Sequence, residues 1–147
     1  MAAGKRDCSL RLAVASVSRL PVPDKSCDII MNVFAPDDAG QFGRVLRPGG
    51  VLLKAVPREE HLLGLKKAVY EKPYLNPPPV YSSEGFNELE RVDIDDDILL
   101  DSCRQINNLF MMTPYYYKTS ADDQAKLLKL EKLETELRFS VFVMQKI

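Results

Sequence analysis

The chain has 147 residues, of which 46% are hydrophobic and 28% are charged, and this balance is typical of one globular domain with a sizeable core. Such a composition excludes an intrinsically disordered chain, a collagen and a coiled coil. There are 20 Lys and Arg residues against 21 Asp and Glu residues, and the net charge of -1 excludes a general attraction to nucleic acid or to an anionic membrane. Any polyanion site would have to be local.

Targeting signals give a simple expectation. No apolar run approaches the roughly 20 residues that are needed to span a bilayer. The start of the chain is not followed by the apolar core of a signal peptide. We therefore expect a cytoplasmic protein without a membrane partner.

The cysteines and the histidine restrict the chemistry. Cys8, Cys27 and Cys103 are odd in number and widely separated, which argues against a disulfide framework and against a structural zinc. We interpret them as buried thiols. His61 is the single histidine, so a site with several histidine ligands is impossible, and no GxSxG motif supports a Ser/His/Asp triad. No metal site is expected.

The first half of the chain alternates strand and helix patterns. Residues 10–15 are a short apolar run that predicts a strand, and the prolines of residues 16–23 predict a loop. Residues 28–34 are a continuous apolar stretch, which suits a strand buried on both faces. Residues 51–56 form the next apolar strand pattern.

A helix is expected between the last two of these strands. Asp37 and Asp38 are its N-cap candidates, and the Arg-Pro-Gly-Gly run at 47–50 ends it. Its apolar side carries Phe42, Val45 and Leu46.

Together these elements predict an α/β fold with a parallel sheet and right-handed crossovers. Ligands of such sheets bind beyond the carboxyl ends of the strands. These ends correspond to residues 15–16, 32–36 and 56–61.

The second half continues the mixture. Apolar residues at helical spacing predict a helix over residues 61–70, which a proline-rich connector follows. An extended segment or hairpin is expected next, then two helices, the second capped by Ser120, and a closing strand with alternating apolar residues. The ranges are 86–100 for the extended segment, 102–112 and 121–130 for the helices, and 135–144 for the strand.

Three features permit two interpretations each. Asp93, Asp95 and Asp97 match the first positions of a calcium loop, but Ile98 and Arg104 occupy positions that need glycine and glutamate, so a solvated strand or hairpin edge is favoured. The Tyr-Tyr-Tyr-Lys run at 115–118 could stack on bases or pack in the core. His61 could cap a helix or contact a ligand at the edge of the sheet.

Several short segments, in this order, resemble the ribosomal RNA large-subunit (guanine-N1)-methyltransferase family. The Leu-Pro and Arg-Pro-Gly-Gly segments are common to many class I methyltransferases, whereas the His-Leu and Met-Thr-Pro segments are more specific. The matching text is Val-Ala-Ser at 14–16, Leu-Pro at 20–21, Asp-Ile-Ile at 28–30, Phe-Ala-Pro at 34–36, Arg-Pro-Gly-Gly at 47–50, His-Leu at 61–62, Met-Thr-Pro-Tyr at 112–115 and Leu-Glu-Thr at 133–135.

The resemblance implies a partial Rossmann-like class I methyltransferase sheet with flanking helices. The family's zinc module, first strands and glycine-rich cofactor loop have no counterpart in this sequence, which looks like the carboxyl-terminal portion of such an enzyme. We expect the chain alone to be inactive. Its parts are an α/β half at 1–71, a proline-rich connector at 72–86 and carboxyl-terminal strands and helices at 87–147.

Residue roles also follow from the resemblance. The implied cofactor is S-adenosylmethionine, and the implied substrate is a guanine of 23S ribosomal RNA. No residue is assigned as the base that removes the guanine N1 proton. The implied cofactor contacts are Ala15, Ser16, Asn32, Val33, Phe34 and His61, and the implied guanine contacts are Phe34, Pro36, Met112, Thr113, Pro114 and Tyr117.

The expected lack of a central strand has a physical consequence. An exposed sheet edge and its apolar surface favour self-association, so we expect a homodimer. Two other functions stay open: a non-catalytic interaction module that retains the sheet, and a methyltransferase that acts on a small molecule.

Overall fold

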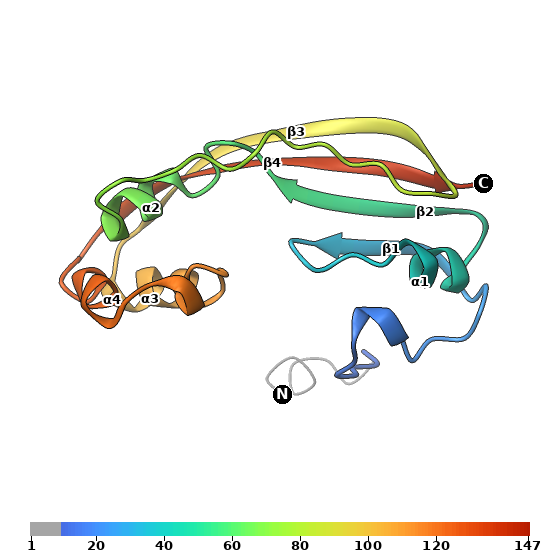
Figure 1. Cartoon of the computed structure of the whole chain (residues 1–147), viewed down its shortest axis with the longest axis horizontal. Coiled ribbons are helices and arrows are strands. Elements are labelled where there is room, and N and C mark those ends of the chain that lie inside the picture. Colours follow the sequence, from blue (N-terminus) through green and yellow to red (C-terminus); the bar gives the residue numbers. More distant parts are fainter. Residues whose placement is uncertain (1–9) are drawn as a thin grey trace.

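A computed structural model describes residues 10–147 and has the predicted α/β class (Figure 1). Cys8, one of the three expected buried thiols, lies outside the described residues. The elements in chain order are the 3-10 helix η2 (Val17–Arg19), β1 (Cys27–Val33), α1 (Ala39–Val45), β2 (Leu46–Pro57), α2 (Leu63–Val69), β3 (Phe86–Leu100), α3 (Cys103–Met111), the 3-10 helix η3 (Tyr116–Lys118), α4 (Ala121–Leu127) and β4 (Leu133–Lys146).

The four strands form one mixed sheet in the order β1-β2-β4-β3. β1 and β2 are parallel, whereas β4 is antiparallel to both β2 and β3. The last strand of the chain thus lies between β2 and β3. The expected parallel crossover is confirmed for the unit formed by β1, α1 and β2, and the carboxyl-terminal strands add an antiparallel pair. The extended alternative for residues 86–100 is confirmed, because β3 runs as one strand along β4.

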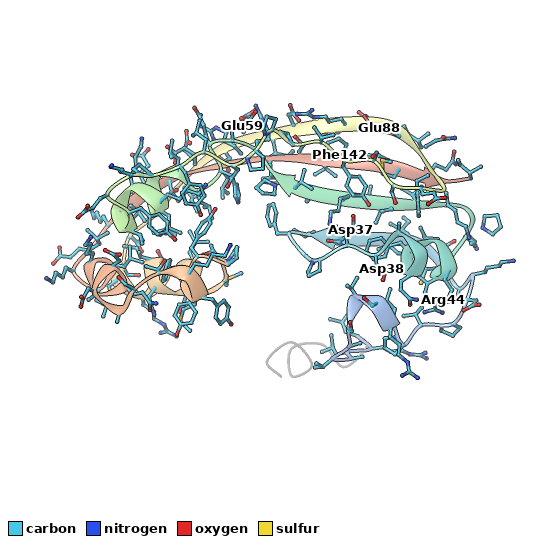
Figure 2. The ribbon with its side chains drawn as sticks, in the orientation of Figure 1. Asp37, Asp38, Arg44, Glu59, Glu88 and Phe142 are labelled. Carbon is cyan, nitrogen blue, oxygen red and sulfur yellow. The ribbon has the colours of Figure 1, made fainter. Side chains whose placement is uncertain are left out.

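The helices gather at opposite ends of the sheet (Figure 1). α1 lies beside β1 and β2, and α2, α3 and α4 lie together at the other end of the long β3 and β4 strands. Asp38 caps α1 as predicted, because its carboxylate accepts the N–H of Gln41 at 2.9 Å (Figure 2). At the other end of α1, the Lys146 ammonium donates to the carbonyl oxygens of Gly43 and Leu46 at 2.6 and 2.8 Å.

Two apolar clusters hold these parts together. The first joins α1 to one face of the sheet, and the second joins α2, α3 and α4. Their buried members are Phe42, Leu46, Leu52, Phe86, Phe142 and Met144 in the first cluster, and Leu62, Leu65, Val69, Ile106, Phe110 and Leu127 in the second.

The strand predicted at residues 10–15 is wrong. This segment carries no strand, and the side chains of Leu10, Leu12 and Val14 are exposed. The physical reason is that a strand needs a neighbour for its backbone hydrogen bonds, and none of the four strands in residues 10–147 pairs with this run.

Burial of β1 on both faces is also wrong. Ile29, Met31 and Val33 are 59%, 71% and 52% exposed, although Asn32 between them is buried. Alternate residues of a strand point to opposite faces, so only one face of β1 is covered within the described chain. Cys27 and Cys103 are half-buried and not fully buried as expected, because Cys27 lies at the start of this open strand and Cys103 in the first turn of α3.

The amino terminus of α2 is fitted closely to β4. Leu62 has φ 55° and offers no side-chain cap, so the helix begins at Leu63 and not at residue 61 as predicted. The first free amides are satisfied from β4: Glu136 accepts the N–H of Gly64 at 2.7 Å, and the Thr135 hydroxyl accepts the N–H of Leu65 at 3.2 Å. A Cβ on Gly64 would lie 2.3 Å from the carbonyl oxygen of Glu134.

Gly64→Ala should therefore destabilise the protein, because the new Cβ meets backbone that cannot turn away. We expect a loss of roughly 1–3 kcal/mol in the free energy of unfolding, measured by urea denaturation. Gly43→Ala in α1 is the matched control, since a Cβ there meets nothing within 4 Å. It should stabilise α1 by about 0.5–1 kcal/mol. Equal effects of the two substitutions would contradict the close fit of α2 on β4.

Candidate functional site

An aromatic cluster marks the carboxyl ends of β1 and β2. The Phe34 ring lies 5.1 Å from the His61 ring and 5.6 Å from the Phe139 ring, and the His61 and Phe139 rings are 6.2 Å apart. Phe34 directly follows β1, His61 lies in the turn after β2, and Phe139 belongs to β4. The structure thus brings together two residues that the sequence placed at the site, and adds Phe139, which the sequence did not indicate.

Backbone geometry at this cluster is unusual. Phe34 and Leu62 have φ values of 50° and 55°, in the left-handed region that residues other than glycine rarely adopt. Phe34 begins the turn that leaves β1, and Leu62 ends the turn that carries His61. Residues held in this region often occur at functional sites, where the surroundings enforce the conformation.

His61 is buried and neutral. Its side chain is 7% exposed, and Nδ1 accepts the backbone N–H of Arg138 at 3.2 Å. Burial, and to a smaller extent the nearby Lys66 ammonium, lower the pKa of His61 to about 4. With Nδ1 acting as an acceptor, the proton of the neutral ring is on Nε2. At neutral pH the ring therefore offers an N–H donor without a positive charge.

Asn32 holds the turn after β1. Its side-chain amide donates to the carbonyl oxygen of Pro36 at 2.8 Å, and its oxygen accepts from the Lys54 ammonium at 3.2 Å. Lys54 also donates to the carbonyl oxygen of Ala35 at 3.0 Å and lies 3.8 Å from Asp37. Asn32 and Lys54 are both buried. Sequence reasoning missed Lys54, although a lysine inside an apolar strand pattern is a signal that its charge needs partners.

The predicted guanine contacts form two groups. Phe34, half exposed, and Pro36 belong to the turn after β1. The other group extends from the end of α3 into η3, and the Thr113 hydroxyl there donates to the carbonyl oxygen of Phe110 at 2.8 Å. Met112 and Tyr117 there are 84% and 85% exposed. β1 points toward the end of the molecule where α3 lies (Figure 1).

The tyrosines of residues 115–117 differ in burial, and each of the two interpretations fits some of them. Tyr115 and Tyr116 pack against the cluster of α2, α3 and α4, as core packing predicts. Tyr117 is exposed, and its ring lies 5.2 Å from that of Tyr116. One tyrosine of the three is thus free to stack on a ligand.

Ala15 and Ser16 are not connected to the aromatic cluster by hydrogen bonds within the described residues. Both are exposed, and Ser16 caps η2 by accepting the N–H of Ser18 at 3.3 Å. The described residues show no hydrogen bond or ring contact that joins them to Phe34 or His61.

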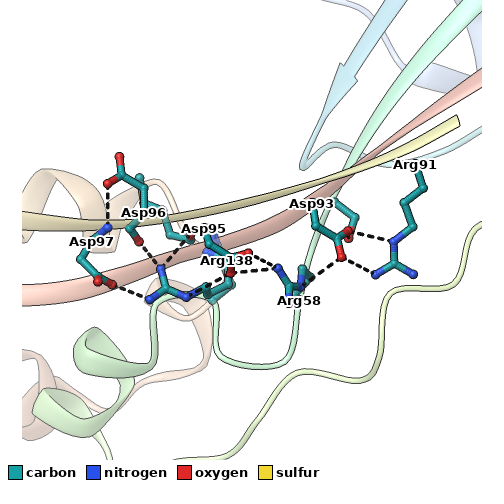
Figure 3. A network of polar contacts seen from close by, with 10 residues as sticks. Arg58, Arg91, Asp93, Asp95, Asp96, Asp97 and Arg138 are labelled. Atoms are coloured by element: carbon teal, nitrogen blue, oxygen red, sulfur yellow. Dashed lines mark hydrogen bonds and ion pairs between the residues drawn. The ribbon is translucent and has the colours of Figure 1, made fainter.

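The acidic run of β3 is paired with arginines (Figure 3). Arg58 donates to both carboxylate oxygens of Asp95 at 2.9 and 2.8 Å, and Arg138 donates to Asp97 at 2.8 Å and to the carbonyl oxygen of Asp96. The hydrogen bond from Arg91 and that from Ser140 hold the pKa of Asp93 below its usual range. β3 is an edge strand of the sheet, as predicted for this run, and arginines pair with the carboxylates of Asp93, Asp95 and Asp97.

A polar hollow of about 300 Å³ adjoins this network and not the aromatic cluster. Arg138 and Phe139 are neighbours on β4, so their side chains point to opposite faces of the sheet. The hollow is lined by Arg58, Glu59, Glu60, Leu75, Asp95 and Arg138.

Two further properties concern the described chain as a whole. Among residues 10–147, no three His, Cys, Asp or Glu side chains are grouped so that they could hold a metal ion. No helix in the same range is long and apolar enough to cross a membrane.

The buried neutral state of His61 predicts a pH dependence of stability. The folded pKa of about 4 lies below the unfolded value of about 6.5, so stability should fall as the pH falls from 6.5 to 4. The loss should be at most about 3 kcal/mol, and it should be absent from His61→Gln. Urea denaturation of both proteins across this range checks it. Because the chain has one histidine, proton NMR also reads the His61 pKa directly. A measured value near 6.5 would contradict the burial of the ring.

Curated relatives match parts of the chain. The protein is 37% identical over 68 residues to the "Putative 23S rRNA (guanine-N(1)-)-methyltransferase YxjB" of Bacillus subtilis, with 46% of this chain and 24% of that protein covered. It is 43% identical over 58 residues to the 23S rRNA (guanine(748)-N(1))-methyltransferase of Streptomyces fradiae, with 39% and 21% covered. These matches span about a quarter or less of the relatives' length. No family model matches the chain.

Two solved structures match the chain with low similarity. The YcgJ protein of Bacillus subtilis is 14% identical with a TM-score of 0.45, over 90% of this chain and 69% of that one. The "putative methyltransferase (BH2331)" of Bacillus halodurans is 14% identical with a TM-score of 0.47, and the match covers 95% of this chain and 79% of that one. The α/β class rests on the chain's own helices and strands. The curated matches confirm that the sequence resembles 23S rRNA (guanine-N1)-methyltransferases over part of its length.

Proposed function

We propose that this chain is part of an S-adenosylmethionine-dependent methyltransferase that modifies N1 of a guanine in 23S ribosomal RNA. The observation that carries the proposal is the contact between Phe34 and His61 at the carboxyl ends of two parallel strands. This is the edge at which α/β sheets bind their ligands. The proposal draws its substrate and cofactor from the names of the curated relatives and from the resemblance that the sequence carries.

The residues at this edge fit one side of the cofactor. S-adenosylmethionine would supply an electrophilic methyl group on a positively charged sulfur. A neutral His61 does not repel that charge and keeps the Nε2–H free to donate, while Phe34 offers a half-exposed apolar ring. Asn32 and Val33 would support the same contact from β1. Ala15 and Ser16 are the proposed neighbours of the adenine.

His61 is better suited to binding than to proton transfer. A general base is most effective when its pKa lies near the working pH, and the pKa of His61 is about 4. We therefore assign it to the cofactor and leave the base to a group beyond those named here.

The substrate side is proposed at the two groups of guanine contacts. A guanine splayed from an RNA loop would stack on an exposed aromatic ring, for which Tyr117 is available. Met112, Thr113 and Pro114 would border it from the same segment, and Phe34 and Pro36 from the turn after β1. These residues would act by aligning guanine N1 with the methyl group, because in-line alignment supplies much of the acceleration.

The chain is proposed to be inactive alone. Residues 1–71, 72–86 and 87–147 would be consecutive parts of one methyltransferase domain, whose glycine-rich cofactor loop has no counterpart in this sequence. The proposed partner is ribosomal RNA, bound by the complete enzyme, and the proposed location is the cytoplasm.

Calorimetry tests the proposal. S-adenosylmethionine is titrated into the chain and into a fusion that carries the amino-terminal part of a curated relative. The fusion should bind the cofactor and the chain alone should not. In the fusion, His61→Ala should weaken binding about tenfold, equivalent to about 1.4 kcal/mol. Asn108→Ala, at an exposed position of α3, should not change it.

Each other outcome opposes the proposal in a different way. Tight binding by the chain alone would contradict the need for the added part. Binding by neither protein would favour a non-catalytic interaction module. Methylation of a small acceptor without any effect of RNA would favour the small-molecule alternative.

We also propose that the chain by itself forms a homodimer through β1. The amide of Phe34 donates to the carbonyl oxygen of Ala55 in β2 at 3.3 Å, so by alternation the amides of Ile29, Met31 and Val33 point away from β2. A two-fold axis at Met31 would place Ile29 of one copy opposite Val33 of the other. The exposed side chains of Ile29, Met31 and Val33 are apolar and uncharged, which makes this part of the edge self-complementary.

Sedimentation equilibrium tests the dimer. The wild-type chain should sediment as a dimer, and Met31→Lys should convert it to a monomer because the two-fold axis would bring two ammonium groups together. Leu128→Lys replaces an exposed leucine beyond α4 and should leave the dimer intact. A monomeric wild-type chain, or dissociation by both substitutions, would contradict pairing at β1.

A further inference from the structure

Lys66 is a fully buried lysine whose ammonium lies in a polar and aromatic cage. It comes from α2, and its Nζ donates to the carbonyl oxygen of Tyr74 at 3.0 Å and to Oδ1 of Asn76 at 2.7 Å. The same atom lies 4.4 Å from the centre of the Tyr74 ring and 5.3 Å from that of Tyr115. Burying an ammonium group costs desolvation free energy. Hydrogen bonds and ring faces around the Lys66 ammonium offset this cost and indicate that the lysine has a specific structural role.

No carboxylate balances this charge in the described part of the chain, where none of the ion pairs includes Lys66. Burial lowers the pKa of Lys66. A leucine or methionine would fill the same position in α2 at lower cost. The favourable interactions of the ammonium are therefore those with Tyr74 and Asn76 in the connector and with the Tyr115 ring, and the first two fix the path of the connector near α2.

Asn76 connects Lys66 to the turn of residues 58–61, which contains His61. Its backbone N–H donates to the carbonyl oxygen of Glu59 at 2.8 Å. Its side-chain Nδ2 donates to the carbonyl oxygen of Arg58 at 2.8 Å and to that of His61 at 3.5 Å. One asparagine thus binds three carbonyl groups of a four-residue turn.

The ammonium also decides which way the Asn76 amide faces. Lys66 has only donors, so the oxygen of the amide must face it, and Nδ2 must then face the turn. The opposite orientation would set Nδ2 against the ammonium and the amide oxygen against two carbonyl oxygens. Lys66 therefore sets the direction in which Asn76 donates.

We propose that Lys66 and Asn76 act as a pair of positioning residues that hold the turn of residues 58–61, and with it the His61 ring, against Phe34. Neither residue belongs to the predicted cofactor or guanine contacts. Their consequence for catalysis rests on the proposed function, in which His61 contacts the cofactor, but the hold on the turn is a property of this chain alone. Asn76 holds the backbone carbonyl of His61, and the Arg138 amide holds Nδ1 of its ring.

NMR of the single histidine tests the pair without a cofactor. In Asn76→Ala the loosened turn should let water reach the ring, so the His61 pKa should rise from about 4 by one unit or more, about a tenfold change in its proton affinity. Lys66→Met should also raise it, by freeing the Asn76 amide and by removing a positive charge. Lys66→Met with Asn76→Ala should shift the pKa by less than the sum of the two single shifts, because the two residues act through one contact.

Matched controls exclude general effects of charge and of truncation. Lys67→Met removes the exposed neighbouring ammonium of α2, and Asn108→Ala truncates an exposed asparagine of α3. Both should leave the His61 pKa unchanged. A second readout is the Arg138 amide, which donates to His61 Nδ1 and should exchange with solvent faster in Asn76→Ala than in either control.

The inference is overturned if Asn76→Ala keeps the His61 pKa near 4 and the Arg138 amide protected. If that variant loses the native signals of α3 and α4, Asn76→Leu replaces it, because leucine fills the volume without donating, and the same two readouts decide. A different result would contradict the proposed function: His61→Ala would leave the affinity of the fusion for S-adenosylmethionine unchanged. That result does not depend on how Asn76→Ala affects the His61 ring.

Discussion

The insertion of β4 between β2 and β3 is the constraint on which the rest of the molecule depends. The last strand of the chain supplies backbone partners to both neighbours, so β3 joins the sheet only once β4 is in place. Its side chains then reach the helices: Thr135 and Glu136 cap α2, and Lys146 caps α1. These contacts join residues about 70 to 100 positions apart, which makes the fold dependent on long-range contacts.

The candidate site also depends on β4. Arg138 fixes His61 through its backbone amide and pairs with the acidic run of β3 through its guanidinium, while Phe139 contacts Phe34 from the other face. One short stretch of β4 therefore contributes to the aromatic cluster on one face of the sheet and to the charged network on the other. Because alternate side chains of a strand point to opposite faces, the two environments lie close together without mixing.

The sequence indicated that Phe34 and His61 lie at one edge of the sheet, but it did not indicate the buried lysines that support this region. His61 and Phe34 were placed at a ligand edge by the rule for α/β strands, and they do lie in contact. Lys54 and Lys66 were not recognised as buried, because a lysine in an apolar pattern is normally assigned to the surface. Only the positions of Asn32, Ala35, Tyr74 and Asn76 make their burial possible, since these provide acceptors for the two ammonium groups.

By itself the sequence determined the elements with local signals: the Asp38 cap of α1, the Ser120 cap of α4, and the period-two pattern of β4. Tertiary structure alone decided which apolar runs became strands. Residues 10–15 have the pattern and remain irregular, whereas residues 86–100, interrupted by four aspartates, pair with β4 from end to end except for a register shift between Glu88 and Glu90. A strand is stabilised by its neighbour's hydrogen bonds and by cross-strand partners such as Arg138, and neither is encoded within the strand itself.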